Sequence, residues 1–246
     1  MTEPRWKSYV LLALAVASAI LLFFIKPIPQ PQNYHQLADT RSFFGIPNTL
    51  NVLSNLLFLI VGLQGLVTCI RNRDLNNRVA WLVTFAGVTL VSIGSAYYHW
   101  MPNDESLVWD RLPMTIAFMA FLSAILGEYL GEKIGRIVLF PTLLIGVASV
   151  VYWHQYNDLR IYAWVVFAPL LIILALLLLY RSVHRHALIG MLVFYIAAKL
   201  AEEFDKALYS AFAMNISGHS LKHLLAAAAC YWMVVMVRHG TTQASQ

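Results

Sequence analysis

Long, nearly uninterrupted apolar runs recur along this chain and limit what it can fold into. Each run approaches the roughly 20 residues that an α-helix needs to cross the hydrocarbon core of a bilayer. Of the 246 residues, 60% are hydrophobic and only 12% are charged. Soluble domains usually carry about 25% charged residues, so this composition indicates a lipid environment. We therefore predict an all-α integral membrane protein.

The apolar runs predict eight spanning helices. The first follows Arg5 and Lys7, as a signal peptide would, but Ile-Lys-Pro-Ile-Pro comes after it instead of a small-residue cleavage site. We interpret this run as a retained helix that precedes a seven-helix transmembrane core. The predicted spans are Tyr9–Ile25, Leu50–Ile70, Val79–His99, Pro113–Leu130, Ile137–Trp153, Ile161–Tyr180, Ala187–Tyr209 and Leu221–Val237. The predicted organisation is an N-terminal helix (1–30), an outer-face loop (31–48), a seven-helix core (49–238) and a tail (239–246).

The lysines and arginines between the spans predict the orientation of the chain. If the amino terminus is inside, the inner segments carry ten of these residues and the outer loops carry four. Positive loops stay on the cytoplasmic side, so both termini are predicted to be cytoplasmic. The net charge of +5 is spread over these short loops, and nucleic acid is not an expected partner. The four outer residues are Lys26, Arg41, Arg111 and Arg160.

Three of the eight histidines form a candidate metal site. His219 and His223 are four residues apart at the start of the last span, so both imidazoles lie on one face of a helix. His99 ends the third span, and the predicted topology brings all three to the outer membrane face. Three imidazoles without a fourth protein ligand are typical of catalytic zinc, whose open position holds water. The alternative is a set of interfacial histidines that bond to neighbours, as we expect for His35, His154, His184, His186 and His239.

Asp110 and Ser95 are candidate catalytic residues beside these histidines. Asp110 follows His99 across a short predicted loop, and a carboxylate there could act as general base and then general acid. Alternatively it caps a helix that begins near Pro113. Ser95 precedes His99 by four residues and could donate a hydrogen bond to an oxyanion. The spacing alone favours a simpler role for Ser95, as a small residue in a helix–helix contact.

Charged residues in the seventh predicted span form a second group of candidates. Charges within a span are costly and usually face the interior of the bundle or pair with each other. We regard four of these side chains, including one between the two C-terminal histidines, as candidates for binding a polar lipid headgroup. They are Lys199, Glu202, Asp205 and Lys222.

Taken together, these motifs resemble the alkaline ceramidase family of integral membrane hydrolases. The matching pattern is Ser95-x-x-x-His99, then Asp110, then His219-x-x-x-His223. The start of the second span also resembles the first core helix of the family. The resemblance extends from about Asn48 to Arg238, and the residues that match in the second span are Asn48, Asn51, Ser54 and Asn55.

The resemblance implies a function and a cofactor. It implies zinc held by His99, His219 and His223, with Ser95 and Asp110 in the site, in a superfamily that includes the progestin and adiponectin receptors. The implied reaction cleaves the amide bond of ceramide and gives a sphingoid base and a fatty acid.

The chain departs from this family in two ways. The N-terminal helix precedes the seven-helix core. Eukaryotic members bind calcium through an acidic stretch before the core, whereas Tyr34–Asn48 offers Asp39 as its only carboxylate here. Calcium prefers several oxygen ligands, so we do not expect a calcium site.

Our hypothesis from the sequence is a zinc-dependent amidase that acts on ceramide or a related membrane lipid. Two alternatives share the architecture: a receptor-like zinc protein with little turnover, and a lipid ester hydrolase. A transporter fits less well, because transporters place their sites near the midplane of an internal repeat. The sequence leaves the acyl-chain preference and the oligomeric state open.

Overall fold

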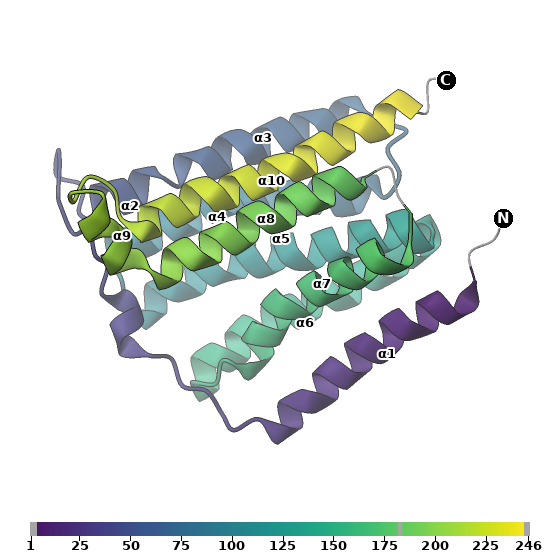
Figure 1. The fold of residues 1–246 in the computed structure, drawn as a ribbon, viewed down its shortest axis with the longest axis horizontal. Helices are drawn as coiled ribbons and strands as arrows, with labels where there is room; N and C mark the ends of the chain where they lie inside the picture. Colours follow the sequence, from purple (N-terminus) through teal and green to yellow (C-terminus); the bar gives the residue numbers. More distant parts are fainter. Residues whose placement is uncertain (1–3, 182–183, 244–246) are drawn as a thin grey trace.

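A computed structural model of the chain describes residues 4–181 and 184–243, with side chains up to residue 238. Its long helices run side by side along one direction (Figure 1). Seven of the described helical segments are long and apolar enough to cross a membrane, which agrees with the predicted all-α membrane fold. The elements are α1 (Arg5–Leu21), η1 (Leu22–Phe24), η2 (Gln32–His35), α2 (Thr49–Leu53), α3 (Leu56–Arg71), α4 (Arg78–Trp100), α5 (Asp104–Leu130), α6 (Glu132–Tyr156), α7 (Arg160–Leu179), α8 (Arg185–Glu203), α9 (Asp205–Ala211) and α10 (Gly218–Gln243).

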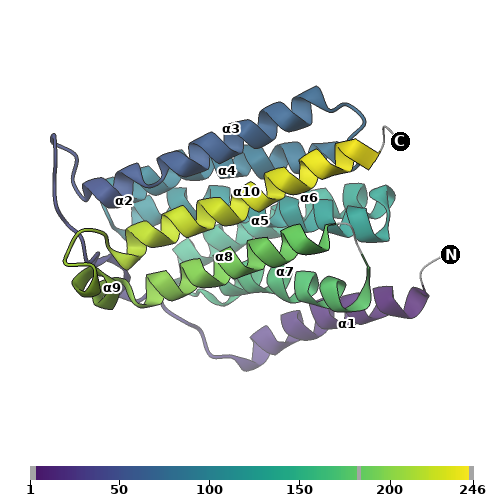
Figure 2. The same cartoon turned by 45° about the horizontal axis from the view of Figure 1, so that its top comes forward.

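Helix α8, which corresponds to the seventh predicted span, is not among these seven segments, because its 19 residues include four charged ones. The predicted span Ala187–Tyr209 is too long, because the helix ends at Glu203 and the chain turns at Phe204 into the short α9. With 19 residues, α8 is about 28 Å long at 1.5 Å per residue, close to the thickness of the hydrocarbon core. It lies along α10 in both views (Figures 1 and 2). The charged residues Lys199, Glu202 and Glu203 therefore lie near the end of α8, next to the turn into α9.

Helix α5 begins nine residues earlier than predicted. Its N-cap is Asn103, whose side chain accepts a hydrogen bond from the backbone N–H of Ser106 at 2.8 Å, while the Ser106 hydroxyl accepts one from the Asn103 N–H at 3.2 Å. Pro113 lies inside the helix, where membrane proteins tolerate proline. The alternative role of Asp110 as an N-cap is therefore wrong. Arg111, predicted in an outer loop, also lies within α5.

The proline inside α5 coincides with a close approach of α4. Pro113 has no N–H, so the carbonyl of Trp109, four residues before it, loses its usual helical partner. A Cβ atom built on Gly94 of α4 would lie only 2.0 Å from that carbonyl oxygen. The missing side chain at Gly94 thus allows the two backbones to meet next to Ser95 and Asp110.

Helix α1 lies at the edge of the bundle beside α7 (Figure 1). The indole N–H of Trp164 on α7 donates to the Ser18 hydroxyl of α1 at 3.0 Å. Much of its remaining surface carries exposed apolar side chains, such as Leu12 and Leu21, as expected for a helix in contact with lipid.

The segment of residues 26–48, which we call the outer segment, covers the end of the bundle where α9 lies. The side chain of Asn157 accepts from the Gln30 backbone N–H at 2.8 Å, and Asn48 donates to the His99 carbonyl at 2.8 Å. The first residue of α1 and the last turn of α10 lie at the opposite end (Figure 2). The polar residues that the outer segment contacts are thus gathered at one end of an otherwise apolar bundle.

Candidate metal and active site

The three predicted metal-binding histidines meet beneath the outer segment. His99 comes from the last turn of α4, and His219 and His223 come from the first turns of α10. All three are buried, and one ring nitrogen from each lies within 4.8 Å of the others. The ring centroids are 4.7 to 5.0 Å apart. The described residues contain no other such cluster of histidine, cysteine and carboxylate ligands.

The spacing of two of these ring nitrogens is close to that expected around a tetrahedral metal ion. The Nε2 atoms of His99 and His219 are 3.2 Å apart. Two nitrogens bound to one zinc ion at about 2.05 Å and at the tetrahedral angle would be about 3.3 Å apart. The Nε2 atom of His223 has no hydrogen-bond partner among the described residues. Buried polar atoms are rarely left without a partner, so this donor set fits a zinc ion.

Neighbouring groups hold the histidines in place. The Ser54 hydroxyl lies 2.7 Å from Nδ1 of His223, which leaves Nε2 of that ring for the cluster. Ser54 lies at the short break between α2 and α3, which presents its side chain to α10. Such contacts fix the orientation and tautomer of metal-binding imidazoles.

Ser95 and Asp110 face each other where α4 and α5 approach. Both side chains are buried, and both line the same cavity. The approach at Gly94 brings this pair together. Ser95 thus lies both at the contact between α4 and α5 and in the cavity wall, and its chemical role stays a prediction.

A cavity of about 320 Å³ opens next to this pair and extends into the bundle. His223, Ser95 and Asp110 line its polar end. The rest of its wall is mostly apolar and comes from α5, α7, α8 and α10. Representative apolar residues are Phe121, Val166, Ile173, Met191 and Met233. The cavity thus joins a polar end to a chamber suited to a hydrocarbon chain.

Three of the four headgroup candidates line the polar end of this cavity. Glu202 forms an ion pair with Lys199 and another with Lys222, the latter at 2.8 Å. The Tyr34 hydroxyl of the outer segment donates to Glu202 at 3.2 Å. Burial, followed by the charge of Glu202, raises the pKa of Tyr34 well above its usual value, so this phenol remains a donor.

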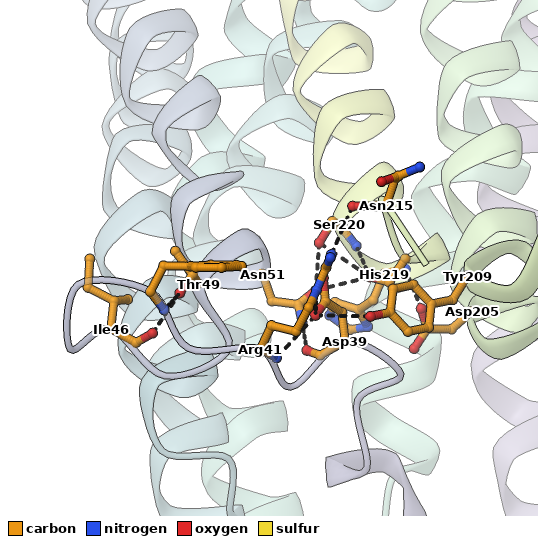
Figure 3. Close-up of polar contacts among 12 residues, drawn as sticks. Asp39, Arg41, Ile46, Thr49, Asn51, Asp205, Tyr209, Asn215, His219 and Ser220 are labelled. Atoms are coloured by element: carbon orange, nitrogen blue, oxygen red, sulfur yellow. Dashed lines mark hydrogen bonds and ion pairs between the residues drawn. The ribbon is translucent and has the colours of Figure 1, made fainter. Parts of the chain in front are cut away.

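Asp205, the fourth candidate, does not line the cavity and instead binds backbone groups (Figure 3). One carboxylate oxygen accepts from the backbone N–H of His219 at 2.7 Å, and the other accepts from Ala38 at 3.0 Å. Asp205 thereby joins the start of α10 to the outer segment. Sequence reasoning missed this role because Ala38 and His219 are far apart in the chain.

The carboxylate in the outer segment is bound to an arginine. Asp39 accepts two hydrogen bonds from the Arg41 guanidinium, at 2.8 and 2.7 Å, and Arg41 also donates to the Asn215 carbonyl at 2.9 Å (Figure 3). Burial alone would raise the pKa of Asp39, but the hydrogen bonds and charge of Arg41 outweigh it and lower this pKa. The ion pair lies within the outer segment, and the hydrogen bond from Arg41 to Asn215 fastens this segment to the loop before α10.

The remaining histidines lie away from this cluster. The His35 ring contacts the Tyr98 hydroxyl and Asp104, each at 3.0 Å, and His154 lies 3.6 Å from Glu105. His184 and His186 lie at the start of α8, near the opposite end of the bundle. The side chain of His239 is outside the described residues, as are those of the predicted tail.

Comparison with known protein families identifies the chain at the family level. A search of curated proteins gives no significant match. A family model described as Ceramidase matches residues 45–246, which is most of the chain. The chain therefore belongs to the ceramidase family.

Proposed function

We propose that this protein hydrolyses the amide bond of ceramide, or of a related membrane lipid, in a zinc-dependent reaction. The products are a sphingoid base and a free fatty acid. The observation that carries this proposal is the meeting of three elements at one point: the buried histidine cluster, the Ser95–Asp110 pair and the mouth of an apolar cavity. Membership in the ceramidase family supports the same reaction class.

His99, His219 and His223 would hold the metal ion. When bound there, zinc supplies a Lewis acid that polarises a carbonyl group and lowers the pKa of water. The contact between Ser54 and His223 maintains the tautomer that this binding requires.

Asp110 moves the proton in this scheme. Its carboxylate accepts a proton from the attacking water, whose oxygen becomes part of the fatty acid. The same carboxyl group then gives that proton to the amide nitrogen, so that the nitrogen leaves as a neutral amine when the C–N bond breaks. The position of Asp110 beside His223 in the cavity wall suits both transfers.

Ser95 has two tasks. Its hydroxyl would hold the Asp110 carboxylate before the reaction, since both side chains line the same cavity. It then donates to the oxygen of the former carbonyl as negative charge develops there, a contribution that is typically worth about 10²- to 10³-fold in rate.

The acyl chain of the lipid would occupy the apolar part of the cavity. The walls from α7 and α10 offer branched and sulfur-containing side chains that tolerate chains of different shape. The polar groups of the sphingoid base would remain at the other end, near Glu202 and Lys222.

The test uses the detergent-purified full-length protein and its His219→Ala variant. We expect about one zinc ion per wild-type chain, release of fatty acid from ceramide, and loss of both in the variant. His154→Ala, which removes a histidine outside the cluster, should retain both. Wild-type protein without bound metal would refute the zinc site. Bound zinc without amide cleavage would favour the receptor-like protein or the ester hydrolase.

We also propose that both termini are cytoplasmic and that the histidine cluster lies near the outer membrane face. With Arg111 inside α5, the outer loops retain Lys26, Arg41 and Arg160, which strengthens the positive-inside bias. The fully exposed Phe44 offers a test. A Phe44→Cys variant should react in intact cells with a thiol reagent that cannot cross membranes, and lack of reaction until the cells are lysed would reverse the orientation.

A further inference from the structure

Arg111 is a buried cation in the cavity wall whose hydrogen-bonding capacity is largely unused. Its side chain is only 5% exposed, and it lines the polar end of the cavity. The Nη2 atom donates to the side-chain oxygen of Gln30 at 2.8 Å. The Nη1 atom is buried and has no partner among the described residues. A buried guanidinium with unused donors is costly, so this arrangement calls for an acceptor.

An aromatic cage holds the guanidinium by its faces. Its central carbon lies 4.0 Å from the ring centroid of Trp153, 4.5 Å from that of Tyr162 and 5.8 Å from that of Tyr34. Aromatic faces stabilise the positive charge without accepting its N–H groups in the guanidinium plane. The cage therefore fixes Arg111 while leaving donors at its edge for a ligand.

The charges in the cavity wall leave Arg111 without a carboxylate partner. Three cationic side chains and two carboxylates occur among the described lining residues, an excess of one positive charge. Both cavity lysines pair with Glu202. Arg111 makes no ion pair within the described part of the chain. Arg111 is thus the cavity cation that lacks an anionic partner, and an anionic ligand would supply one.

We propose that Arg111 forms an oxyanion-binding subsite for the lipid in the cavity. This proposal rests on the proposed function, because it takes a lipid amide as the occupant. A carboxylate or a phosphate matches the planar guanidinium edge, and such charge-assisted hydrogen bonds are the strong ones. The oxyanion has two sources: a phosphate on the headgroup of the substrate, or the carboxylate of the fatty acid that hydrolysis releases.

The first experiment compares ceramide with ceramide phosphorylated at its headgroup, both with the same acyl chain. If the headgroup carries the oxyanion, wild type should have the higher kcat/KM for the phosphorylated lipid. Arg111→Gln should reduce this preference by roughly ten- to a hundredfold, the usual worth of a charge-assisted hydrogen bond in a buried site. Arg136→Gln, which removes an exposed arginine at the opposite end of the bundle, should keep the wild-type preference.

The second experiment compares a fatty acid with the fatty alcohol of the same chain length as ligands of the full-length protein, by inhibition and by thermal shift. If the product carries the oxyanion, the acid should bind more tightly than the alcohol, and Arg111→Gln should abolish the difference. Arg111→Lys, which keeps the charge but not the planar edge, should retain part of it. Thermal shift needs no turnover, so this arm remains informative even if no amide is cleaved.

The outcomes separate the two proposals. Cleavage of ceramide without preference for either anionic ligand in wild type would overturn the oxyanion subsite and leave the amidase intact. The same conclusion follows if the preference survives in Arg111→Gln. Tight, Arg111-dependent binding of the fatty acid without cleavage of any lipid amide would support the subsite and refute the proposed function.

Discussion

Helices α1 and α10 are both long and apolar enough to cross a membrane, but they are held in very different ways. The most apolar window of α1 has a mean hydropathy of 2.1 and is 6% buried, whereas that of α10 has a mean hydropathy of 1.5 and is 44% buried. The less apolar helix is therefore the better packed one. Lipid is as apolar as a leucine side chain, so apolar character alone does not draw a helix into a bundle.

The helix–helix contacts explain this difference. Helix α10 is fixed by polar groups, because Asp205 binds its first turn and Ser54 binds His223. Helix α1 has the hydrogen bond between Ser18 and Trp164, together with the connection that leads into the outer segment. Polar contacts thus hold α10 against its neighbours. Helix α1 has fewer such contacts, and most of its surface stays exposed.

Among the variants near the histidine cluster, Asp110→Asn should have the largest effect on turnover. The amide cannot take up the proton, so turnover should fall by about a hundred- to ten-thousandfold while zinc remains bound. Initial rates and metal content would be measured on the same sample. Glu105→Gln, which neutralises an exposed carboxylate of the same helix, serves as the control. Undiminished turnover in Asp110→Asn would remove Asp110 from the mechanism.

Gly94→Ala should come next. The added methyl would lie 2.0 Å from the Trp109 carbonyl oxygen, and backbone atoms there cannot move aside easily. We expect a loss of about 1–3 kcal/mol of stability, with reduced activity, because α4 and α5 must separate next to Ser95. Thermal unfolding in detergent would measure the first effect. Ile93→Ala, which changes a lipid-facing neighbour, should be much milder, and equal losses in both variants would contradict the close approach.

Asp205→Ala tests the attachment of α10. The backbone N–H groups of Ala38 and His219 would lose their acceptor, at a cost of about 1–3 kcal/mol. We expect weaker retention of zinc in a chelator titration, because the first turn of α10 carries His219. Asp205→Asn should be intermediate, and Glu203→Ala, which truncates an exposed carboxylate nearby, should behave as wild type. Unchanged zinc retention in Asp205→Ala would mean that this carboxylate does not position the cluster.

A smaller, pH-dependent effect is expected where the loop between α6 and α7 binds the end of α1. Hydrogen bonds from Arg160 lower the pKa of Asp158 to about 2, and Arg160 also donates to the Ile25 carbonyl at 2.7 Å. A carboxyl group with a lowered pKa stabilises the fold above its unfolded-state pKa, and this stabilisation disappears as the pH falls through the folded value. Asp158→Asn should therefore be less stable than wild type at neutral pH. The difference in melting temperature should shrink as the pH falls from about 4 towards 2, and a constant difference would argue against this ion pair.

The smallest effect should come from Ser18→Ala in α1. It removes the acceptor of the Trp164 indole in a helix that is otherwise mostly in lipid. We expect a change in stability within about 0.5 kcal/mol and normal turnover. A large loss of activity would show that α1 matters to the site, and would remove the contrast with α10.

Hydropathy was enough to predict the fold class, because the residues of a spanning helix that face lipid are apolar. The i, i+4 spacing of His219 and His223, together with the predicted direction of each span, was enough to predict that His99 would join them. The structure brings these residues and Ser95 with Asp110 to one place, while their chemical roles remain predictions.

Two features could not be read from local sequence. The start of α5 was misplaced because Pro113 resembles a helix start, and only the contact between Gly94 and Trp109 shows how the proline is accommodated. Arg111 resembled an ordinary loop cation, because its cage is assembled from Trp153 and Tyr162, which are distant in the chain. Long-range contacts of this kind leave no periodic signal.

The outer segment has a consequence for the supply of reactants. Amide hydrolysis consumes one lipid and one water molecule per turnover, and the two come from opposite phases. His99 is fully buried, and the Tyr34 hydroxyl of the outer segment donates a hydrogen bond to Glu202. The cavity wall is mostly apolar, so the proposed reaction would take place among few water molecules. Under the proposed function, water would act at this site as a reagent and not as the solvent.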